Sequence, residues 1–466
     1  MSDLTVKSKA SMVRTVSTQV PSDRESMLRV VRFGIFCLPL LAFTIPGRDV
    51  PVSFGSIDAL AVGKVLALLV VVSFGSLLLV QQFHGGRSRG CQPSPEARTV
   101  LWAFVPYLMF LGWAALSVLW TANVSVSLGQ AGGLASLLII ALLVGLLAGT
   151  KAGIERVLKS LAWSLLMFSS IVLMVHFLAP GLSGLDRRML ITGADGLVHP
   201  TAAAANSSLG LLVVLMCWLV QRYSWAGRLA LVAVCVHGTA LFLTSSRTAL
   251  GASLVTIVVM FFISGDNRRR AWIGMASALL ALVMLVTDPG FRVFSDPESV
   301  GVTYVTRGQS FTQLKALSGR EEMWSKVWDE YLKSPLKGHG YFLTSSTGEM
   351  EVWEMKANHT AHNIYLQVVS GTGLIGLGLF LIAVGTLLLR FLKLRQGDAA
   401  SRKMFQMLFL VMLWFFGWTL LSASFMGPVR SESVCFYTFL GLGVGGCVRM
   451  ASSGTSLGRR REIADA

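Results

Sequence analysis

The stretch NIYLQVVSGTGLIGLGLFLIAVGTLLL, residues 363–389, contains no charged residue. A transmembrane helix needs about 20 mostly apolar residues to cross the hydrocarbon core of a bilayer, so this stretch predicts a membrane-spanning helix. Other apolar runs qualify, or nearly qualify, by the same test: 30–47, 58–80, 100–120, 128–148, 157–179, 203–220, 228–244, 248–264, 271–287, 404–426 and 431–448.

The composition of the whole chain agrees with this reading. Of its 466 residues, 53% are hydrophobic and only 14% are charged, and the mean hydropathy is +0.65. These values exclude a soluble multidomain enzyme and a disordered chain, and six cysteines are too few for a secreted disulfide scaffold. We therefore expect an all-α polytopic membrane protein with about 12 transmembrane helices.

The orientation follows from the positions of the Lys and Arg residues, because positively charged loops stay in the cytoplasm. With the first residues inside, the inner segments hold 26 Lys and Arg, whereas the short outer loops hold five. Both termini are therefore expected in the cytoplasm. The predicted division is a cytoplasmic tail 1–29, helices one to nine in 30–287, an outer loop domain 288–361, helices ten to twelve in 362–449, and a disordered cytoplasmic tail 450–466.

The outer segment 288–361 is the one stretch outside the predicted spans that is large enough to fold. It contains LSGREEMWSKVWDEYLKSP (317–335), in which Leu317, Trp324, Trp328 and Leu332 recur at spacings near 3.6. This spacing predicts an amphipathic helix that Pro335 ends. The loop domain is therefore expected to be helical.

Several common functional motifs are missing from the sequence. No nucleotide-binding glycine loop and no metal-binding His-Glu-x-x-His motif occurs, so neither a cofactor nor a metal is predicted. The net charge of +16 is explained by the inner loops, and no nucleic-acid partner is expected. At membrane depth we find Lys64, His176 and His237 but no acid, which disfavours a proton-coupled carrier.

Cationic side chains instead gather on the predicted outer side. Arg247 lies in TSSRTALGA (244–252), in a turn so short that it joins the outer ends of two helices. Ser245 or Ser246 can cap the following helix, which leaves Arg247 beside a positive helix end and favours an anion there. Arg320, in SGREEMW (318–324), opens the amphipathic helix. Each Arg alone can also be explained by lipid contact or a surface ion pair.

Two further polar segments lie outside. LDRRMLITGADGLVHPTAAAAN (185–206) brings Arg187, Arg188 and His199 close to the start of a span, and His359, His362 and Asn363 run directly into the 363–389 helix. A positive helix end and a nearby Arg disfavour imidazolium, so His362 is expected to be neutral and able to accept a proton. The alternative is that this His caps its helix.

The series SSRTAL (245–250), GREEMW (319–324), KGHGYF (337–342) and HNIYLQVVSGTGLIG (362–376), in this order around a large outer loop, resembles the O-antigen ligase and O-antigen polymerase superfamily. The resemblance covers roughly residues 180–380. It implies a GT-C-type glycosyltransferase that uses an undecaprenyl-pyrophosphate-linked glycan at the periplasmic face of the bacterial inner membrane, without nucleotide or metal.

The resemblance also implies roles for individual residues. Arg247, Arg320 and Arg188 match the arginines that hold the donor pyrophosphate, and His362 matches the functional His. The catalytic candidates are thus His362, Arg247 and Arg320. Supporting candidates are Arg187, His199, His339, His359, Asn363 and Tyr365.

Three functions remain open from the sequence. An O-antigen ligase would transfer the glycan to a sugar hydroxyl of the lipid A core oligosaccharide, with inversion. A polymerase would use a second lipid-linked glycan as acceptor. A lipid-linked glycan flippase or a scaffold would also show many helices and outer arginines, but it would not need the His. The length and the His-Asn motif favour the ligase, whose partners are the lipid-linked donor, the lipid A core and the membrane lipids.

Overall fold

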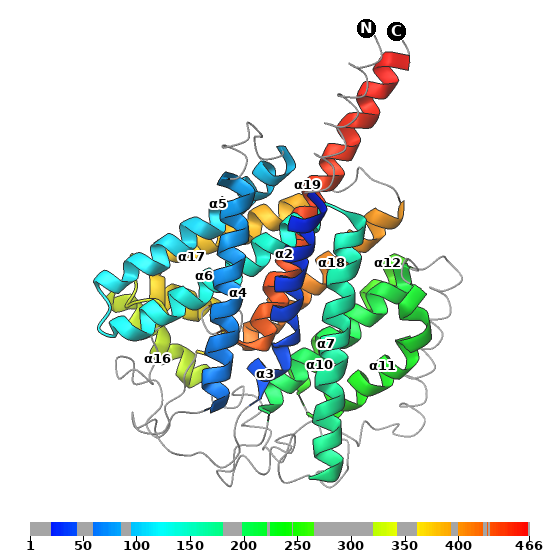
Figure 1. Ribbon diagram of the computed structural model, residues 1–466. Coiled ribbons are helices and arrows are strands. Elements are labelled where there is room, and N and C mark those ends of the chain that lie inside the picture. Colours follow the sequence, from blue (N-terminus) through cyan, green and yellow to red (C-terminus); the bar gives the residue numbers. More distant parts are fainter. Residues whose placement is uncertain are drawn as a thin grey trace.

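The computed structural model describes residues 20–43, 59–84, 95–179, 198–220, 224–244, 246–264, 320–342, 361–392, 399–422, 426 and 429–464. These residues form a bundle of helices (Figure 1). The helices are α2 (Val20–Phe36), α3 (Leu38–Ala42), α4 (Ala59–His84), α5 (Pro95–Leu116), α6 (Val124–Leu147), α7 (Lys151–Leu178), α10 (Pro200–Val220), α11 (Ser224–Leu243), α12 (Arg247–Ser264), α16 (Arg320–Lys333), α17 (Ile364–Leu392), α18 (Ala399–Trp418) and α19 (Ser431–Ala464).

The predicted all-helical membrane architecture is confirmed for the described part of the chain. That part contains no strand, only an isolated bridge between Phe43 and Val198. By length and composition, seven of its helices can cross a membrane: Ala97–Leu119, Val124–Leu147, Lys151–Leu178, Pro200–Val220, Ile364–Phe391, Ser401–Leu421 and Ser431–Met450. Leu66–Gln81, Ala230–Leu243 and Arg247–Ile263 are shorter apolar helices. The predicted span 271–287 lies outside the described residues, so the number twelve stays a prediction.

Two ends of the chain differ from the expectation. The helix that contains the start of the first predicted span, 30–47, begins earlier, at Val20, and the run is divided at Cys37 into α2 and α3. Pro39 has no N–H to donate to the preceding turn, which accounts for the division. At the other end α19 continues to Ala464 (Figure 1), beyond the predicted span 431–448. Extending an existing helix costs much less than starting one, and no proline interrupts this one.

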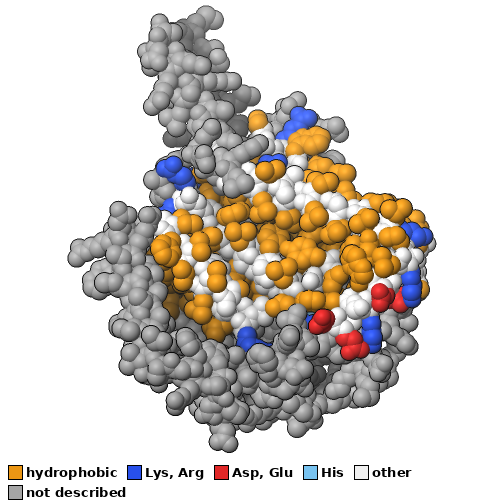
Figure 2. Space-filling view, turned by 180° about the vertical axis from the view of Figure 1, so that it is seen from behind, with side chains coloured by type: hydrophobic (Ala, Val, Ile, Leu, Met, Phe, Trp, Pro, Cys, Tyr) orange, Lys and Arg blue, Asp and Glu red, His pale blue; other side chains and the backbone are white. Residues whose placement is uncertain are grey.

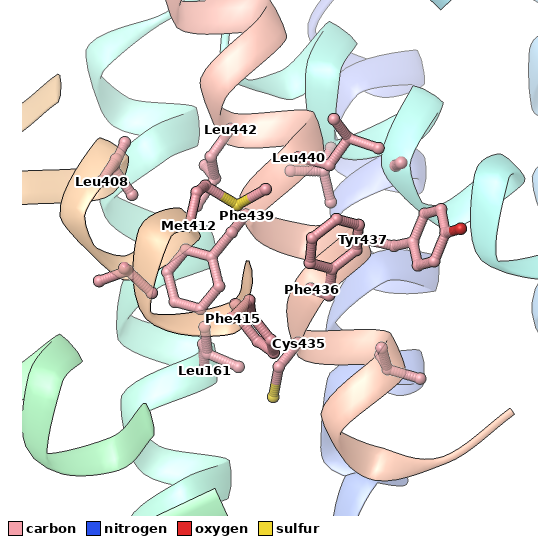
Figure 3. Close-up of a cluster of buried hydrophobic side chains, with 14 of the residues drawn as sticks. Leu161, Leu408, Met412, Phe415, Cys435, Phe436, Tyr437, Phe439, Leu440 and Leu442 are labelled. Atoms are coloured by element: carbon pink, nitrogen blue, oxygen red, sulfur yellow. The ribbon is translucent and has the colours of Figure 1, made fainter. Parts of the chain in front are cut away.

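The interior of the bundle is built around α6, α10 and α19, in which most residues are buried. Phe415 of α18 packs edge-on against Phe436 of α19, with ring centroids 5.3 Å apart, inside a cluster of apolar side chains (Figure 3). Membrane helices associate through close packing of this kind. The hydrophobic effect does not drive their association, because lipid chains are as apolar as leucine side chains.

The outer surface of the bundle is apolar. Figure 2 shows a broad face of hydrophobic side chains, with Lys, Arg, Asp and Glu gathered at its borders. Large side chains such as Leu66, Phe74 and Trp102 are more than half exposed on the helices (56%, 56% and 64%). A contiguous apolar surface of this size is typical of a protein embedded in lipid. The chain is therefore a multi-pass membrane protein.

Candidate functional site

Helix α16 forms as predicted, but it presents a different face to the protein. It begins at Arg320 and ends at Lys333, just before Pro335. Its buried residues are Met323, Val327 and Tyr331. The expected apolar stripe included Trp328 and Leu332, which are in fact exposed (47% and 56%). Burial thus follows the residues that meet α17, which a count of apolar side chains alone cannot identify.

The first half of α16 packs on the start of α17. Met323, Val327 and Ala361 form one buried cluster, against which Trp324 packs. Trp324 Nε1 also donates a hydrogen bond of 2.9 Å to the carbonyl oxygen of Ala361. Residues three and four apart share one face of a helix, so Arg320 lies on the face that includes Met323 and Trp324. This face brings Arg320 to the segment that immediately precedes α17.

The start of α17 is fixed by two side chains of the His-Asn motif. Asn363 Oδ1 accepts hydrogen bonds from the N–H groups of Tyr365 (2.9 Å) and Leu366 (3.1 Å). Gln367 Oε1 reaches back and accepts from the N–H of Ala361 at 2.9 Å. This is a reciprocal cap of the kind that stabilises helix N-termini. The side chain of Asn363 therefore caps the helix.

His362 occupies an unusual backbone conformation between Ala361 and Asn363. Its φ angle is +48°, in the left-handed region that non-glycine residues seldom adopt. Strain of this kind persists where the surroundings determine it, and it concentrates at functional sites. Here the caps on both sides hold the backbone, and the half-buried imidazole stands at the positive end of α17.

Arg247 starts α12, as predicted. The N–H of Leu250 donates to the carbonyl oxygen of Ser246 at 2.9 Å, so Ser246 takes the cap position and Arg247 is the first helical residue. Burial and the nearby positive charge of Arg247 lower the pKa of Arg320 below its usual value. The two guanidinium groups, 73 positions apart in sequence, are therefore within electrostatic range of each other.

The long apolar run 363–389 is not one continuous helix, contrary to the expectation. Gly373 has φ +67° and ψ −170°, which breaks α17. The N–H of Leu374 then donates to the carbonyl oxygen of Pro335 at 2.8 Å, and that of Ile375 donates to Leu336 at 3.3 Å. The loop after α16 thus takes the place of the missing helical turn. Such replacement is needed because unpaired backbone groups are costly in a membrane.

The KGHGYF motif (337–342) contributes further hydrogen bonds between the loop after α16 and α17. The N–H of His339 donates to the carbonyl oxygen of Ser370 at 3.0 Å, and that of Gly340 donates to Gly371 at 2.9 Å. His339 Nε2 lies 2.7 Å from the carbonyl oxygen of Glu330, which can only accept, so this nitrogen carries the proton. The structure gives His339 the role of joining the loop to α16.

The other supporting candidates have different surroundings. His199 caps α10, because its carbonyl oxygen accepts from the N–H of Ala203 at 3.0 Å and its Nδ1 accepts from that of Thr201 at 3.2 Å. Tyr365 packs its ring on Phe380, with centroids 6.2 Å apart. Candidates outside the described residues are Arg187, Arg188 and His359.

One buried acid was missed by the sequence reasoning. Glu432, at the start of α19, is only 3% exposed and accepts a hydrogen bond of 3.0 Å from the hydroxyl of Ser431. The Asn206 amide of α10 donates to the same hydroxyl at 2.7 Å. Glu432 is the second residue of the predicted span 431–448. Its neighbours Ser431 and Ser433 are small and polar, so the local sequence did not indicate that Glu432 is buried.

The fold and this arrangement define a class: a multi-pass helical membrane protein in which the amphipathic helix α16 is docked on a broken membrane helix, with two arginines within electrostatic range of each other. The family model described as O-antigen ligase matches residues 229–381, which contain Arg247, Arg320 and His362. This match confirms the resemblance to the O-antigen ligase family that the motifs indicated. A comparison with curated proteins gives no match. The family indicates a glycosyltransferase of the ligase or polymerase type.

Proposed function

We propose that this protein is an O-antigen ligase of the GT-C type. It would transfer a glycan from undecaprenyl pyrophosphate to a sugar hydroxyl of the lipid A core oligosaccharide, at the periplasmic face of the bacterial inner membrane. The observation that carries the proposal is that Arg247 and Arg320 lie within electrostatic range of each other, with Arg320 on the face of α16 that packs on Ala361, the residue before His362.

The arginine pair is suited to a pyrophosphate leaving group. Burial penalises the charge of Arg320, and the like charge of Arg247 within electrostatic range repels it as well. A dianionic or trianionic group between them removes this penalty and gains charge-assisted, two-pronged hydrogen bonds. The same contacts stabilise the negative charge that develops as the glycosidic oxygen leaves. Arg188, in the outer loop, is proposed as a third ligand.

His362 is proposed as the general base. The attacking sugar hydroxyl must lose its proton as it attacks, and a neutral imidazole can take it. His362 stands at the positive end of α17, and a positive helix end favours a neutral imidazole over a charged one. Direct attack by the activated hydroxyl on the anomeric carbon would invert its configuration, and no metal or cofactor enters the proposed reaction.

Removal of the base tests this assignment. In detergent or nanodiscs, His362→Ala should abolish glycan transfer and leave insertion and donor binding intact, because only the proton acceptor is lost. General base catalysis contributes about 100-fold to 10,000-fold in rate. His176→Ala, which removes an imidazole from the last turn of α7, is the matched control and should transfer normally. Full transfer by His362→Ala would remove the base from the proposal.

Exchange of one cation for another tests the arginines. Arg247→Lys keeps the charge but loses the planar fork, so transfer should fall about 10-fold to 100-fold, equal to one or two hydrogen bonds to a charged group. The control is Arg430→Lys, at the exposed cap position of α19. Equal rates in both variants would mean that Arg247 only anchors the helix end in lipid.

The choice of acceptor separates ligase from polymerase. Purified protein and lipid-linked glycan would be given either lipid A core or a second lipid-linked glycan. Consumption of the lipid A core supports the ligase, and consumption of the second lipid-linked glycan supports the polymerase. Movement of lipid-linked glycan across vesicles, without any new glycosidic bond and unaffected by His362→Ala, would instead indicate a flippase.

A further inference from the structure

A pocket of about 420 Å³ lies between α2 and α7, on helices that do not contribute to the proposed catalytic site. Three cations, Arg32, Arg156 and Lys159, and one carboxylate, Glu25, line it. Arg156 Nη1 lies 3.1 Å from Glu25 Oε2, so this pair ties the two helices together. Neither Arg32 nor Lys159 forms an ion pair with a carboxylate that the structure describes. The pocket therefore carries an excess of positive charge.

The pocket straddles a boundary between charged and apolar sequence. Immediately beyond these charges, residues 33–42 of α2 and α3 and residues 160–175 of α7 contain no charged side chain. Phe36 and Trp163, which are 41% and 42% exposed, line the apolar half of the pocket. Tryptophan is enriched where the hydrocarbon core meets the headgroups. The pocket thus has one charged half and one apolar half, as a lipid has a charged headgroup and apolar chains.

We propose that this pocket binds an anionic phospholipid. Arg32 and Lys159 would bind the phosphate, and the part of the acyl chains nearest the headgroup would pack on Phe36 and Trp163. The volume is in the range of small-molecule sites, about 300 to 1,000 Å³. Basic pockets between membrane helices are suited to phospholipid headgroups by their charge. A free phosphate would satisfy the cations but would leave both aromatic rings uncovered, so the lipid is the better occupant.

Binding of defined lipids to the full-length protein tests the proposal. Protein in a neutral detergent would be titrated with phosphatidylglycerol, phosphatidylcholine or inorganic phosphate, and the bound lipid would be counted by native mass spectrometry. We expect phosphatidylglycerol to bind and phosphatidylcholine to bind weakly. Inorganic phosphate should not displace the bound lipid, since it gains no apolar contact.

Two double variants with the same change in net charge make the test specific. In R32Q/K159Q the affinity for phosphatidylglycerol should fall roughly 30-fold, because each basic side chain near an anionic lipid contributes about fivefold. R98Q/R402Q removes two exposed arginines from the first turns of α5 and α18 and should bind as the wild type does. Trp163→Ala should weaken lipid binding as well.

Three outcomes would overturn the proposal. Equal affinity of the two double variants would mean that the lipid does not use the pocket. Equal binding of phosphatidylcholine would mean that charge does not select the ligand. Displacement by inorganic phosphate, with no effect of Trp163→Ala, would assign the pocket to a free anion. Arg32 and Lys159 are exposed, so the substitutions leave the core of the bundle unchanged.

Discussion

Helices α17 and α19 are both long, apolar and rich in glycine, yet their glycines do opposite things. In α19, Gly441 and Gly445 let α6 approach so closely that an added Cβ would meet the carbonyl oxygens of Ala141 and Gly145. The helix stays continuous. In α17, Gly373 interrupts the helix, and an added Cβ would meet the carbonyl oxygen of Leu336, which belongs to an extramembrane loop.

The difference shows that what approaches the glycine decides its effect. A neighbouring helix has already paired its own backbone groups, so it offers only a surface for packing. The loop after α16 brings unpaired carbonyl and N–H groups, and these replace the hydrogen bonds of the broken turn. The first arrangement stabilises the bundle as a whole, whereas the second fixes one extramembrane helix beside the start of α17.

The largest effect on stability is expected for Gly445→Ala. The new methyl group would meet backbone rather than a flexible side chain, so α6 and α19 must separate. Overpacking of this kind typically costs about 1 to 3 kcal/mol, and the upper end is expected because neither helix can give way. Unfolding in detergent, followed by circular dichroism, measures the loss. An unchanged unfolding midpoint would mean that the helices are not in backbone contact.

A smaller loss of stability but a larger loss of transfer is expected for Gly373→Ala. Gly373 has a positive φ with ψ near 180°, a conformation that is essentially restricted to glycine and costs an alanine roughly 1 to 3 kcal/mol, and the new Cβ would push the loop away. Hydrogen exchange should rise in residues 320–342, and glycan transfer should fall as α16 loses its fixed position. Gly378→Ala, in the same helix with open space around it, is the control and should change neither. Normal exchange in Gly373→Ala would contradict the docking.

The smallest effect is expected for the cap of α17. Asn363→Ala leaves the N–H groups of Tyr365 and Leu366 without their acceptor, at a cost of about 1 kcal/mol. Asn123 caps α6 in the same way, through the N–H of Val126. Asn123→Ala should therefore destabilise the protein equally, but only Asn363→Ala should also lower transfer, because it releases the strained backbone of His362. Equal transfer by both variants would mean that this strain has no functional role.

Much of the fold could be predicted from sequence because most apolar runs are long and bounded by charged or polar residues. The break in α17 could not, since the run 363–389 is uninterrupted and glycine is common in membrane helices. The break depends on the loop at 334–342, far away in sequence. Pro39 was a local signal in the sequence for the division of the first helix at Cys37. The only sequence feature that favoured the continuation of α19 as a helix was the absence of proline.

The individual residues of the candidate site could be predicted from the sequence, but the way in which the helices bring them together could not. Short turns and polar residues placed Arg247 at the start of α12 and His362 at the start of α17. The contact of α16 with α17 depends on Met323, Val327 and Ala361, whose small or ordinary apolar side chains give no signal before folding. Only the order of motifs shared with a family indicated that Arg247 and Arg320 lie within electrostatic range of each other.

The docked loop also limits how the molecule can move. To lift α16 away, the N–H groups of Leu374 and Ile375 would have to give up their acceptors beside hydrocarbon, and each unsatisfied group there costs several kcal/mol. Helix α16 therefore acts as a fixed wall rather than a lid. Opening and closing of this face must come from other segments, and a cross-link between α16 and α17 should leave turnover unchanged.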